Sequence, residues 1–272
     1  MRSRAFVAIA LVCLALAGYW LAAQGGGACV RHRRESERPV GLLLYCGAGI
    51  RPGVEAVIAA FQDEHDIRVD VTYGGSGQQL GQISAIESGD LFMPGADFYL
   101  ETAIERGMAD PETARTVGYF VPVIFVQKGN PLGINTLRDL LKDGVRVGLG
   151  DPRACAVGRN SLEILEKSGI PYPEIGPNVI VKSGTVNELA LAIRLGSLDA
   201  AIIWDANARQ FAGHGETIRI PPERNDIATV PIARLRYSQH PEESMRFIEF
   251  VTSSQGRSLL EAKGYTVSLS DE

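Results

Sequence analysis

Short apolar stretches and amphipathic segments alternate along the chain from residue 41 onward. The uninterrupted apolar run 41–45 is typical of a central parallel strand, and Val54, Val57 and Phe61 then recur at helical spacing. The same patterns predict further strands at 67–73, 119–127, 145–149, 179–181, 200–204 and 227–235. They predict further helices at 78–87, near 104, and at 137–141, 160–167, 187–195, 245–251 and 259–260. This alternation predicts an α/β fold.

The N-terminal segment differs in character from the rest of the chain. Arg2 and Arg4 precede an apolar run over residues 5–23, and Gln24 and three glycines follow it. This order is typical of a secretory signal peptide, and the run is also long enough to remain in a membrane as a signal anchor. Residues 24–37 are expected to form a flexible tether. Either form places the folded body in the periplasm or at the extracytoplasmic face of the membrane.

The charge balance narrows the classes of partner. The formal net charge is −5, and 22% of the residues are charged. Because a nucleic-acid partner requires a basic face, this balance argues against one. It also provides no long-range attraction for anions. An anionic ligand would therefore have to be held by local dipoles.

Gly-rich junctions occur where predicted strands end and helices begin. They cover residues 46–50, 73–78, 150–158 and 183–187. Backbone N–H groups at a helix start are unpaired, and the helix dipole favours negative charge there. Ser76 adds a hydroxyl donor. Together the four junctions predict a cage for a tetrahedral oxyanion. The chain lacks the Gly-Lys-Ser/Thr of a phosphate-binding loop, which argues against nucleotide hydrolysis.

The cysteines leave alternatives open. Cys13 falls in the apolar run and Cys29 in the tether, while Cys46 and Cys155 belong to the folded body. Their spacings match no zinc motif, so neither a metal site nor a cofactor is expected. In an oxidising compartment Cys46 and Cys155 are candidates for one disulfide. Two small buried thiols are the alternative.

Several motifs, taken in order, connect the chain to a known family. They are YGGSG at 73–77, GDLF at 89–92, VQKGNP at 126–131, GLGDP at 148–152 with Gly158, and the C-terminal segments 247–251 and 264–265. With them the body from Gly41 to about Tyr265 resembles the periplasmic molybdate-binding proteins, which belong to the solute-binding superfamily of ABC importers. The resemblance covers nearly the whole body.

The resemblance implies a type II periplasmic-binding fold, with two α/β lobes and a ligand cleft between them. It divides the chain into lobe 1 at 38–120, lobe 2 at 121–226, and a crossover strand with C-terminal helices at 227–272 that return to lobe 1. The extended segments 120–126 and 227–235 are then the crossings between lobes. Hinge closure on the ligand is the expected mechanism.

The resemblance also implies a set of ligand-binding residues. Ser76, flanked by Gly75 and Gly77, falls on a serine that donates to the oxyanion in this family. Val157 and Val186 fall on backbone donors of the next two loops. Two positions depart from the family pattern: Gly49 stands where a serine is usual, and Trp204 where a tyrosine is usual. An indole N–H can also donate, but the identity of the anion stays open among molybdate, tungstate, sulfate and phosphate.

Four further residues are candidate additions to the site. Arg51 and Arg159 follow two of the loops and could add charge-assisted hydrogen bonds; exposed arginines at helix starts are the alternative. Cys46 and Cys155 belong to loops expected to face the cleft from opposite lobes. The hypothesis for these two cysteines is that they bind a thiophilic ligand such as arsenite, or that they form a disulfide between the lobes.

The sequence favours a binding protein over an enzyme. Ser76 has no histidine near it in sequence that would activate it, because the four histidines lie in the tether or in polar, loop-like stretches: His32, His65, His214 and His240. The expected partners are a small oxyanion and an ABC permease, and the chain is expected to be a monomer. A sensory protein read by a membrane receptor is the alternative that the same fold allows.

Overall fold

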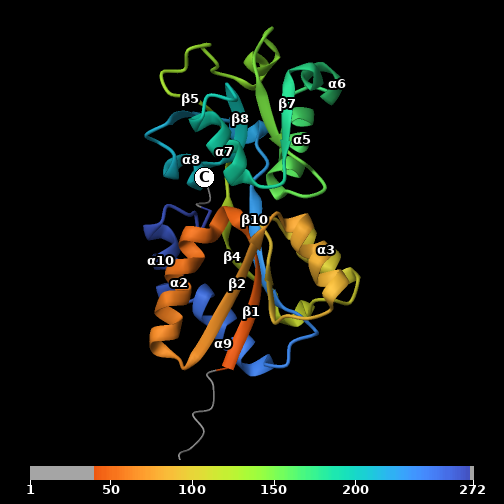
Figure 1. Ribbon diagram of the computed structural model, residues 1–272, viewed down its shortest axis with the longest axis vertical. Coiled ribbons are helices and arrows are strands. Elements are labelled where there is room, and N and C mark those ends of the chain that lie inside the picture. The colour runs from red at the N-terminus through yellow and green to blue at the C-terminus, as the bar shows by residue number, and fades with distance from the viewer. Residues whose placement is uncertain (1–39, 270–272) are drawn as a thin grey trace, which may run out of the picture. The chain divides into compact units, whose positions relative to one another are not determined.

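Two five-stranded sheets contain the strands of residues 40–269. A computed structural model describes residues 40–269, all of which belong to one unit that begins at Pro39. The predicted signal segment 1–23 and tether 24–37 lie outside the described residues. The first sheet has the strand order β2-β1-β3-β10-β4 and the second β7-β6-β8-β5-β9. We call the parts built on these sheets lobe 1 and lobe 2 (Figure 1).

The strands of lobe 1 are β1 (Val40–Gly47), β2 (Ile67–Gly74), β3 (Leu91–Met93), β4 (Arg115–Phe120) and β10 (Ala228–Arg234). Those of lobe 2 are β5 (Pro122–Gln127), β6 (Val147–Gly150), β7 (Val179–Ser183), β8 (Ala200–Trp204) and β9 (Gly215–Arg219). In each lobe three strands are parallel: β1 pairs with β2 and β3, and β6 pairs with β7 and β8. Because parallel strands end at the same edge of a sheet, the loops that follow them gather there.

The helices of lobe 1 are α2 (Arg51–Glu64), α3 (Ser76–Ile86), α4 (Asp97–Glu105), α9 (Pro241–Thr252) and α10 (Ser254–Ala262). Lobe 2 has α5 (Ala156–Lys167), α6 (Tyr172–Ile175), α7 (Val186–Arg194) and α8 (Asp205–Gln210). Figure 1 places α2, α9 and α10 on one side of the first sheet and α3 on the other. None of the helices among residues 40–269 is long and apolar enough to span a membrane.

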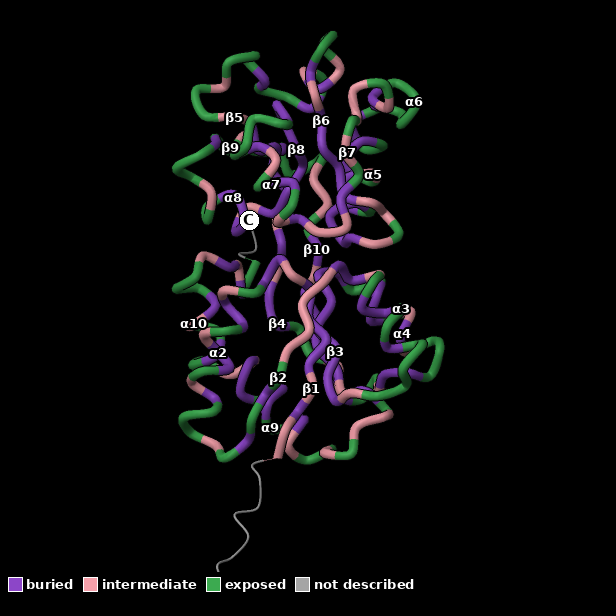
Figure 2. Tube along the Cα trace, viewed as in Figure 1, coloured by how far each residue is buried: buried purple, intermediate pink, exposed green. Residues whose placement is uncertain are grey.

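The core follows the periodicities of the sequence. Val54, Val57 and Phe61 form the buried face of α2, and the ring of Phe61 meets that of Phe247 on α9 edge to face at 5.1 Å. In Figure 2 the strands are mostly buried, whereas the helices have one exposed side. Burying a phenylalanine contributes about 1.5–3 kcal/mol, so Phe61 holds α2 against α9.

The segment 119–127, expected to be one extended strand, consists of two strands in different sheets. β4 ends at Phe120 and β5 begins at Pro122, so Val121 alone separates them. The chain returns to lobe 1 between Arg219 and Ala228, through a 3-10 turn at Pro222–Arg224. Strands β3 and β9 were not predicted, because three residues are too few for a periodic signal in β3 and β9 is largely exposed. The predicted helix at 137–141 is a 3-10 helix.

Candidate functional site

A small cavity lies between the carboxyl ends of the strands of the two lobes. Its volume is about 20 Å³. Loops of both lobes line it, and the lining residues are Gly47, Ala48, Gly49, Gly74, Gly75, Ser76, Gly95, Phe120, Cys155, Ala156, Thr185, Val186 and Trp204. None of them carries a charged side chain. The cavity therefore offers a ligand hydrogen-bond donors and dipoles but no formal charge.

The first residues of helices of both lobes meet at this cavity. Ser76 is the first residue of α3, Ala156 of α5 and Val186 of α7, and each of them lines the cavity. The N–H groups at these positions have no partner within their own helix. Each helix N-terminus also carries a partial positive charge that favours an anion. The partial positive charges of the converging helix N-termini therefore favour an anion in the cavity, although no Lys or Arg side chain is among the lining residues.

Ser76 presents its hydroxyl in a defined orientation. Its side chain is buried at 2% exposure, and its Oγ accepts a hydrogen bond from the N–H of Gly95 at 2.9 Å. Because the oxygen serves as acceptor for Gly95, the hydroxyl hydrogen remains available for a group in the cavity. Thr185 adds a second hydroxyl at the opposite wall; it precedes α7 without capping that helix through its side chain.

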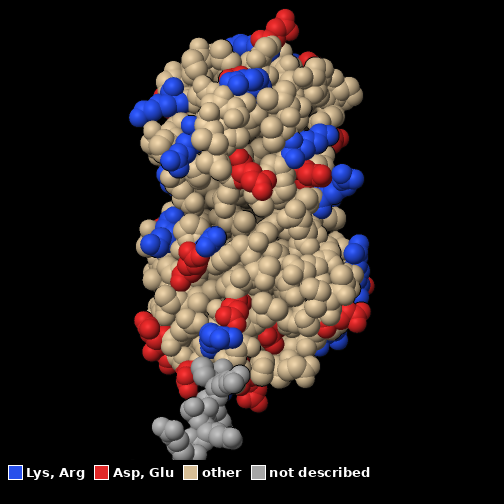
Figure 3. Space-filling view, viewed as in Figure 1, with Lys and Arg blue, Asp and Glu red and all other residues tan. Residues whose placement is uncertain are grey.

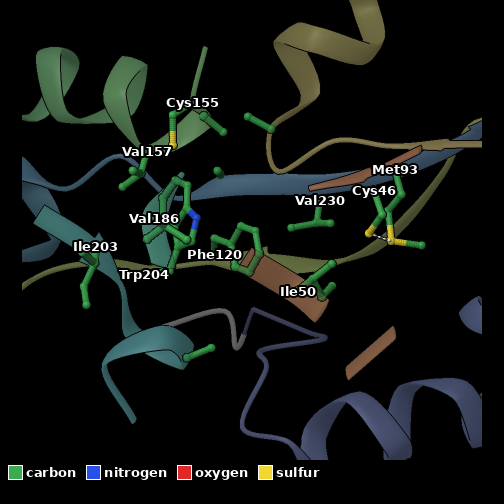
Figure 4. Close-up of a cluster of buried hydrophobic side chains, with 14 of the residues drawn as sticks. Cys46, Ile50, Met93, Phe120, Cys155, Val157, Val186, Ile203, Trp204 and Val230 are labelled. Atoms are coloured by element: carbon green, nitrogen blue, oxygen red, sulfur yellow. Dashed lines mark hydrogen bonds between the residues drawn. The ribbon is translucent and has the colours of Figure 1, made fainter. Parts of the chain in front are cut away.

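Gly49 and Trp204, the two departures from the family pattern, form one structural feature. A Cβ on Gly49 would lie 3.1 Å from Cδ1 of Trp204 and 3.3 Å from Cζ of Phe120. The indole stacks on Phe120 with ring centroids 4.9 Å apart (Figure 4). The indole thus occupies the space that a side chain at position 49 would need. Its N–H makes no hydrogen bond to the described part of the chain and is available to a ligand.

Gly75 and Gly77 bring the two lobes into backbone contact. The N–H of Gly77 donates to the carbonyl of Ala154 in lobe 2 at 3.0 Å, so it is directed at the other lobe and Gly77 does not line the cavity. A Cβ on Gly77 would lie 1.9 Å from the carbonyl oxygen of Arg153, and one on Gly75 2.3 Å from that of Gly184. Only glycine permits this approach. Gly75 lines the cavity as well.

Val157, Arg51 and Arg159, which were also predicted as site residues, lie outside the cavity as well. The N–H of Val157 faces the sulfur of Cys155, so the donor at the start of α5 that lines the cavity belongs to Ala156 instead. Arg51 forms an exposed ion pair with Glu55 at 2.8 Å. The guanidinium of Arg159 lies 3.7 Å from the ring centroid of Phe98, where it joins α5 to α4 of the other lobe. Neither arginine adds charge to the cavity.

The hypotheses that pair Cys46 with Cys155 are wrong. Both thiols are free and buried. Cys46 is fully buried beside Met93 in lobe 1, away from the cavity (Figure 4), because β1 turns its side chain into the core. Cys155 does line the cavity, and burial raises the pKa of its thiol to about 12. A neutral thiol therefore stands at the start of α5.

Several lining residues were missed by sequence reasoning. Gly47, Ala48 and Gly74 belong to junctions that were recognised, so the signal for them was present. No sequence pattern marked Gly95 or Phe120 as a site residue. Gly95 lies in a loop after a very short strand, and Phe120 was interpreted as part of a strand. The described histidines do not line the cavity, and residues 40–269 contain no cluster of His, Cys, Asp and Glu suited to a metal.

Two α/β lobes with a donor-lined cavity between their strand ends define a protein that holds a ligand in a cleft. Residues 42–266 match the family of bacterial extracellular solute-binding proteins, and the chain belongs to this family. A candidate binding protein of Haemophilus influenzae is 32% identical over 227 residues, which cover 82% of this chain and 90% of that relative.

Solved structures show the same fold. The periplasmic molybdate-binding protein of Azotobacter vinelandii matches with a TM-score of 0.74 at 16% identity, over 84% of this chain and 100% of that one. The sulfate-binding protein SubI of Mycobacterium tuberculosis H37Rv matches with a TM-score of 0.74 at 21% identity, over 83% of this chain and 86% of that one. The predicted two-lobed type II periplasmic-binding fold and the resemblance drawn from the motifs are thereby confirmed.

Proposed function

We propose that the protein captures a small tetrahedral oxyanion, with molybdate or tungstate as the first candidates, and delivers it to an ABC permease. The observation that carries this proposal is the convergence of the helix starts at Ser76, Ala156 and Val186 on one uncharged cavity. Helix N-termini bind tetrahedral oxyanions through backbone N–H groups and dipoles. The hydroxyls of Ser76 and Thr185 and the indole N–H of Trp204 add donors.

The size of the cavity supports an inorganic ligand. Its volume of about 20 Å³ is far below the roughly 300–1,000 Å³ of sites for drug-sized molecules. So small a space favours an inorganic ligand, whereas an organic phosphate would require the lobes to stand further apart. Figure 3 shows basic and acidic side chains interspersed on the visible face, so this face presents no single-sign charged surface that would select an anion.

Closure of the lobes is the proposed binding mechanism. Two segments connect them, at Val121 and between Arg219 and Ala228, and both can act as hinges. An anion in the cavity would bond to α3 on one side and to α5 and α7 on the other. Because it bonds to both lobes only in the closed form, it shifts the equilibrium toward closure. The closed form is what the permease would recognise, outside the cytoplasm.

The lining residues also support a binding role over catalysis. Within residues 40–269 no histidine, carboxylate or lysine lines the cavity, so this part of the chain offers no base that would activate the hydroxyl of Ser76. The oxygen of Ser76 is moreover occupied by the N–H of Gly95. We propose that the protein is not an enzyme and that it acts as a monomer.

The identity of the anion is tested by calorimetry and thermal unfolding with molybdate, tungstate, sulfate, phosphate and arsenite. The relatives of this fold include a molybdate-binding and a sulfate-binding protein, so these two anions are compared first. At a hundredfold excess over Kd, a ligand stabilises the protein by about 2.7 kcal/mol. Binding of molybdate and tungstate but not sulfate supports the proposal. If none of the five anions binds, the proposed function is wrong.

A further inference from the structure

Two asparagines of lobe 2 hydrogen-bond the first loop of lobe 1. Asn207 of α8 donates from Nδ2 to the carbonyl of Gly49 at 3.2 Å. Asn187 of α7 donates from Nδ2 to the carbonyl of Ala48 at 3.2 Å. The two side chains are joined, because Nδ2 of Asn207 also donates to Oδ1 of Asn187 at 3.0 Å. One amide network therefore spans two consecutive carbonyls of the other lobe.

The orientation of the Asn207 amide is determined by its surroundings. The residue is completely buried, and both of its Nδ2 hydrogens are directed at oxygen atoms, those of Gly49 and Asn187. A turned amide would place Oδ1 against these two oxygens. The Oδ1 atom in turn has no hydrogen-bond partner in the described part of the chain. A buried polar atom without a partner is destabilising. The stabilising contribution of the Asn207 amide therefore comes from its two donated hydrogen bonds alone.

The carbonyls that these asparagines hold belong to the turn that follows β1. Ala48–Ile50 form a 3-10 turn, and Ala48 and Gly49 line the cavity. In a planar trans peptide the C=O and the N–H point in opposite directions, and residues 40–269 contain no cis peptide. Fixing the carbonyls of Ala48 and Gly49 thus fixes the N–H groups of Gly49 and Ile50 on the opposite side. A hydrogen-bonded carbonyl also polarises its peptide, which makes the N–H a stronger donor.

These bonds require lobe 2 to be closed on lobe 1. Tyr265, a lobe 1 residue, donates its hydroxyl to the same Gly49 carbonyl at 3.0 Å, so this bond persists when the lobes separate. We propose that Asn187 and Asn207 are positioning residues, which hold the Ala48–Ile50 turn with the N–H of Gly49 toward the cavity once the lobes close. This inference rests on the proposed function, since it concerns the donors that the turn offers to an anion.

The kinetics of binding test the proposal. The anion meets the open form first, so bonds that form only after closure affect the dissociation rate and leave the association rate unchanged. The chain has two tryptophans, Trp20 and Trp204. In a full-length Trp20→Phe background, fluorescence of Trp204 at the cavity wall reports binding of molybdate, or of whichever of the five anions binds, in stopped-flow experiments.

Two variants remove the amide network in different ways. Asn187→Ala deletes the bond to Ala48, and alanine is the residue best suited to a helix. Asn207→Asp keeps the shape but sets a carboxylate oxygen against the Gly49 carbonyl. We expect each to raise koff about tenfold or more, which is about 1.4 kcal/mol. The value of kon should be unchanged in Asn187→Ala, whereas the added carboxylate of Asn207→Asp repels the anion and should also lower kon. A merely structural role would lower the fraction of active protein without changing koff of that fraction.

Asn178 provides the matched control. Its Nδ2 donates to the carbonyls of Leu140 and Lys142 at 2.8 and 2.9 Å, within lobe 2 and away from the cavity. Asn178→Ala and Asn178→Asp should leave koff as in the parent protein. Unchanged koff in both Asn187→Ala and Asn207→Asp, with the parent protein binding its anion, overturns this inference alone. A parent protein that binds none of the five anions overturns the proposed function and this inference with it.

Discussion

Replacing Ser76 with alanine removes one oxygen atom that has two partners in the proposed complex. In the protein alone, Oγ accepts the N–H of Gly95 at 2.9 Å in a buried position. In the complex, the hydroxyl hydrogen would donate to the anion. The substitution should therefore lower both the free energy of unfolding and the affinity, by separate amounts that separate experiments can measure.

The two magnitudes follow from the geometry. Loss of Oγ leaves the buried N–H of Gly95 without its acceptor, which costs about 1–3 kcal/mol of stability without ligand. A hydrogen bond to a charged group contributes about 1.5–3 kcal/mol. At about 1.4 kcal/mol for each factor of ten, Ser76→Ala should raise Kd by roughly 10- to 150-fold.

Calorimetry gives Kd, and urea unfolding without ligand gives the stability. Ser244→Ala is the matched control: Ser244 is completely buried in α9, its Oγ lies 3.2 Å from that of Ser238, and it does not line the cavity. The control should lower stability and leave Kd unchanged. If Ser76→Ala also lowers stability and leaves Kd unchanged, Ser76 has only a structural role, and its assignment to the anion site is refuted.

Three further predictions concern closure and pH. Gly77→Ala places a Cβ 1.9 Å from the carbonyl of Arg153, so it should oppose closure and weaken binding by about 1–3 kcal/mol or more. Gly81→Ala in the same helix meets no atom within 4 Å and should bind normally in calorimetry; equal affinities would show that closure does not bring these backbones together. Cys155 is the titratable side chain of the cavity lining, and its pKa is raised to about 12 by burial, so it stays a neutral thiol at lower pH. Affinity for an anion of constant charge should thus be flat between about pH 6 and 9; a decrease in that range that Cys155→Ser abolishes would contradict this. The hydrogen bonds from Arg146 hold the pKa of Asp199 below its ordinary value, so the stability they provide is present at neutral pH and is lost as the carboxylate is protonated in acid. Asp199→Asn should lower the free energy of unfolding by about 1–3 kcal/mol at pH 7, and the difference from wild type should shrink below about pH 4 in urea titrations; an equal difference at both pH values would refute the assignment.

The regular periodicities made much of the fold predictable. The apolar run of β1, the helical spacing of Val54, Val57 and Phe61, and the Gly-rich junctions are local signals, because each depends on residues close in sequence. They identified most strands and helices of both lobes and several loops that line the cavity. Short or exposed elements such as β3 and β9 gave no such signal.

The candidate site shows where local signals end. Gly77 and Gly75 looked like donors to a ligand, but the structure shows that both also admit the backbone of lobe 2, and Gly77 directs its N–H there. Cys46 and Cys155 looked alike in sequence, yet one side chain points into the core and the other lines the cavity. A shift of one residue along a strand or at a helix start changes whether a side chain points into the core or toward the cavity.

By itself the sequence determined the α/β class, the strand–loop–helix junctions and the neutral, donor-rich character of the site, since these follow from residue type and local spacing. Only the tertiary structure decided which donors meet. The indole of Trp204 fills the space beside Gly49, Ser76 accepts a hydrogen bond from Gly95, and Asn207 donates to the carbonyl of Gly49. These contacts join residues that are 19 to 158 positions apart in the sequence. Such contacts depend on how two sheets pack and close, which no local pattern encodes.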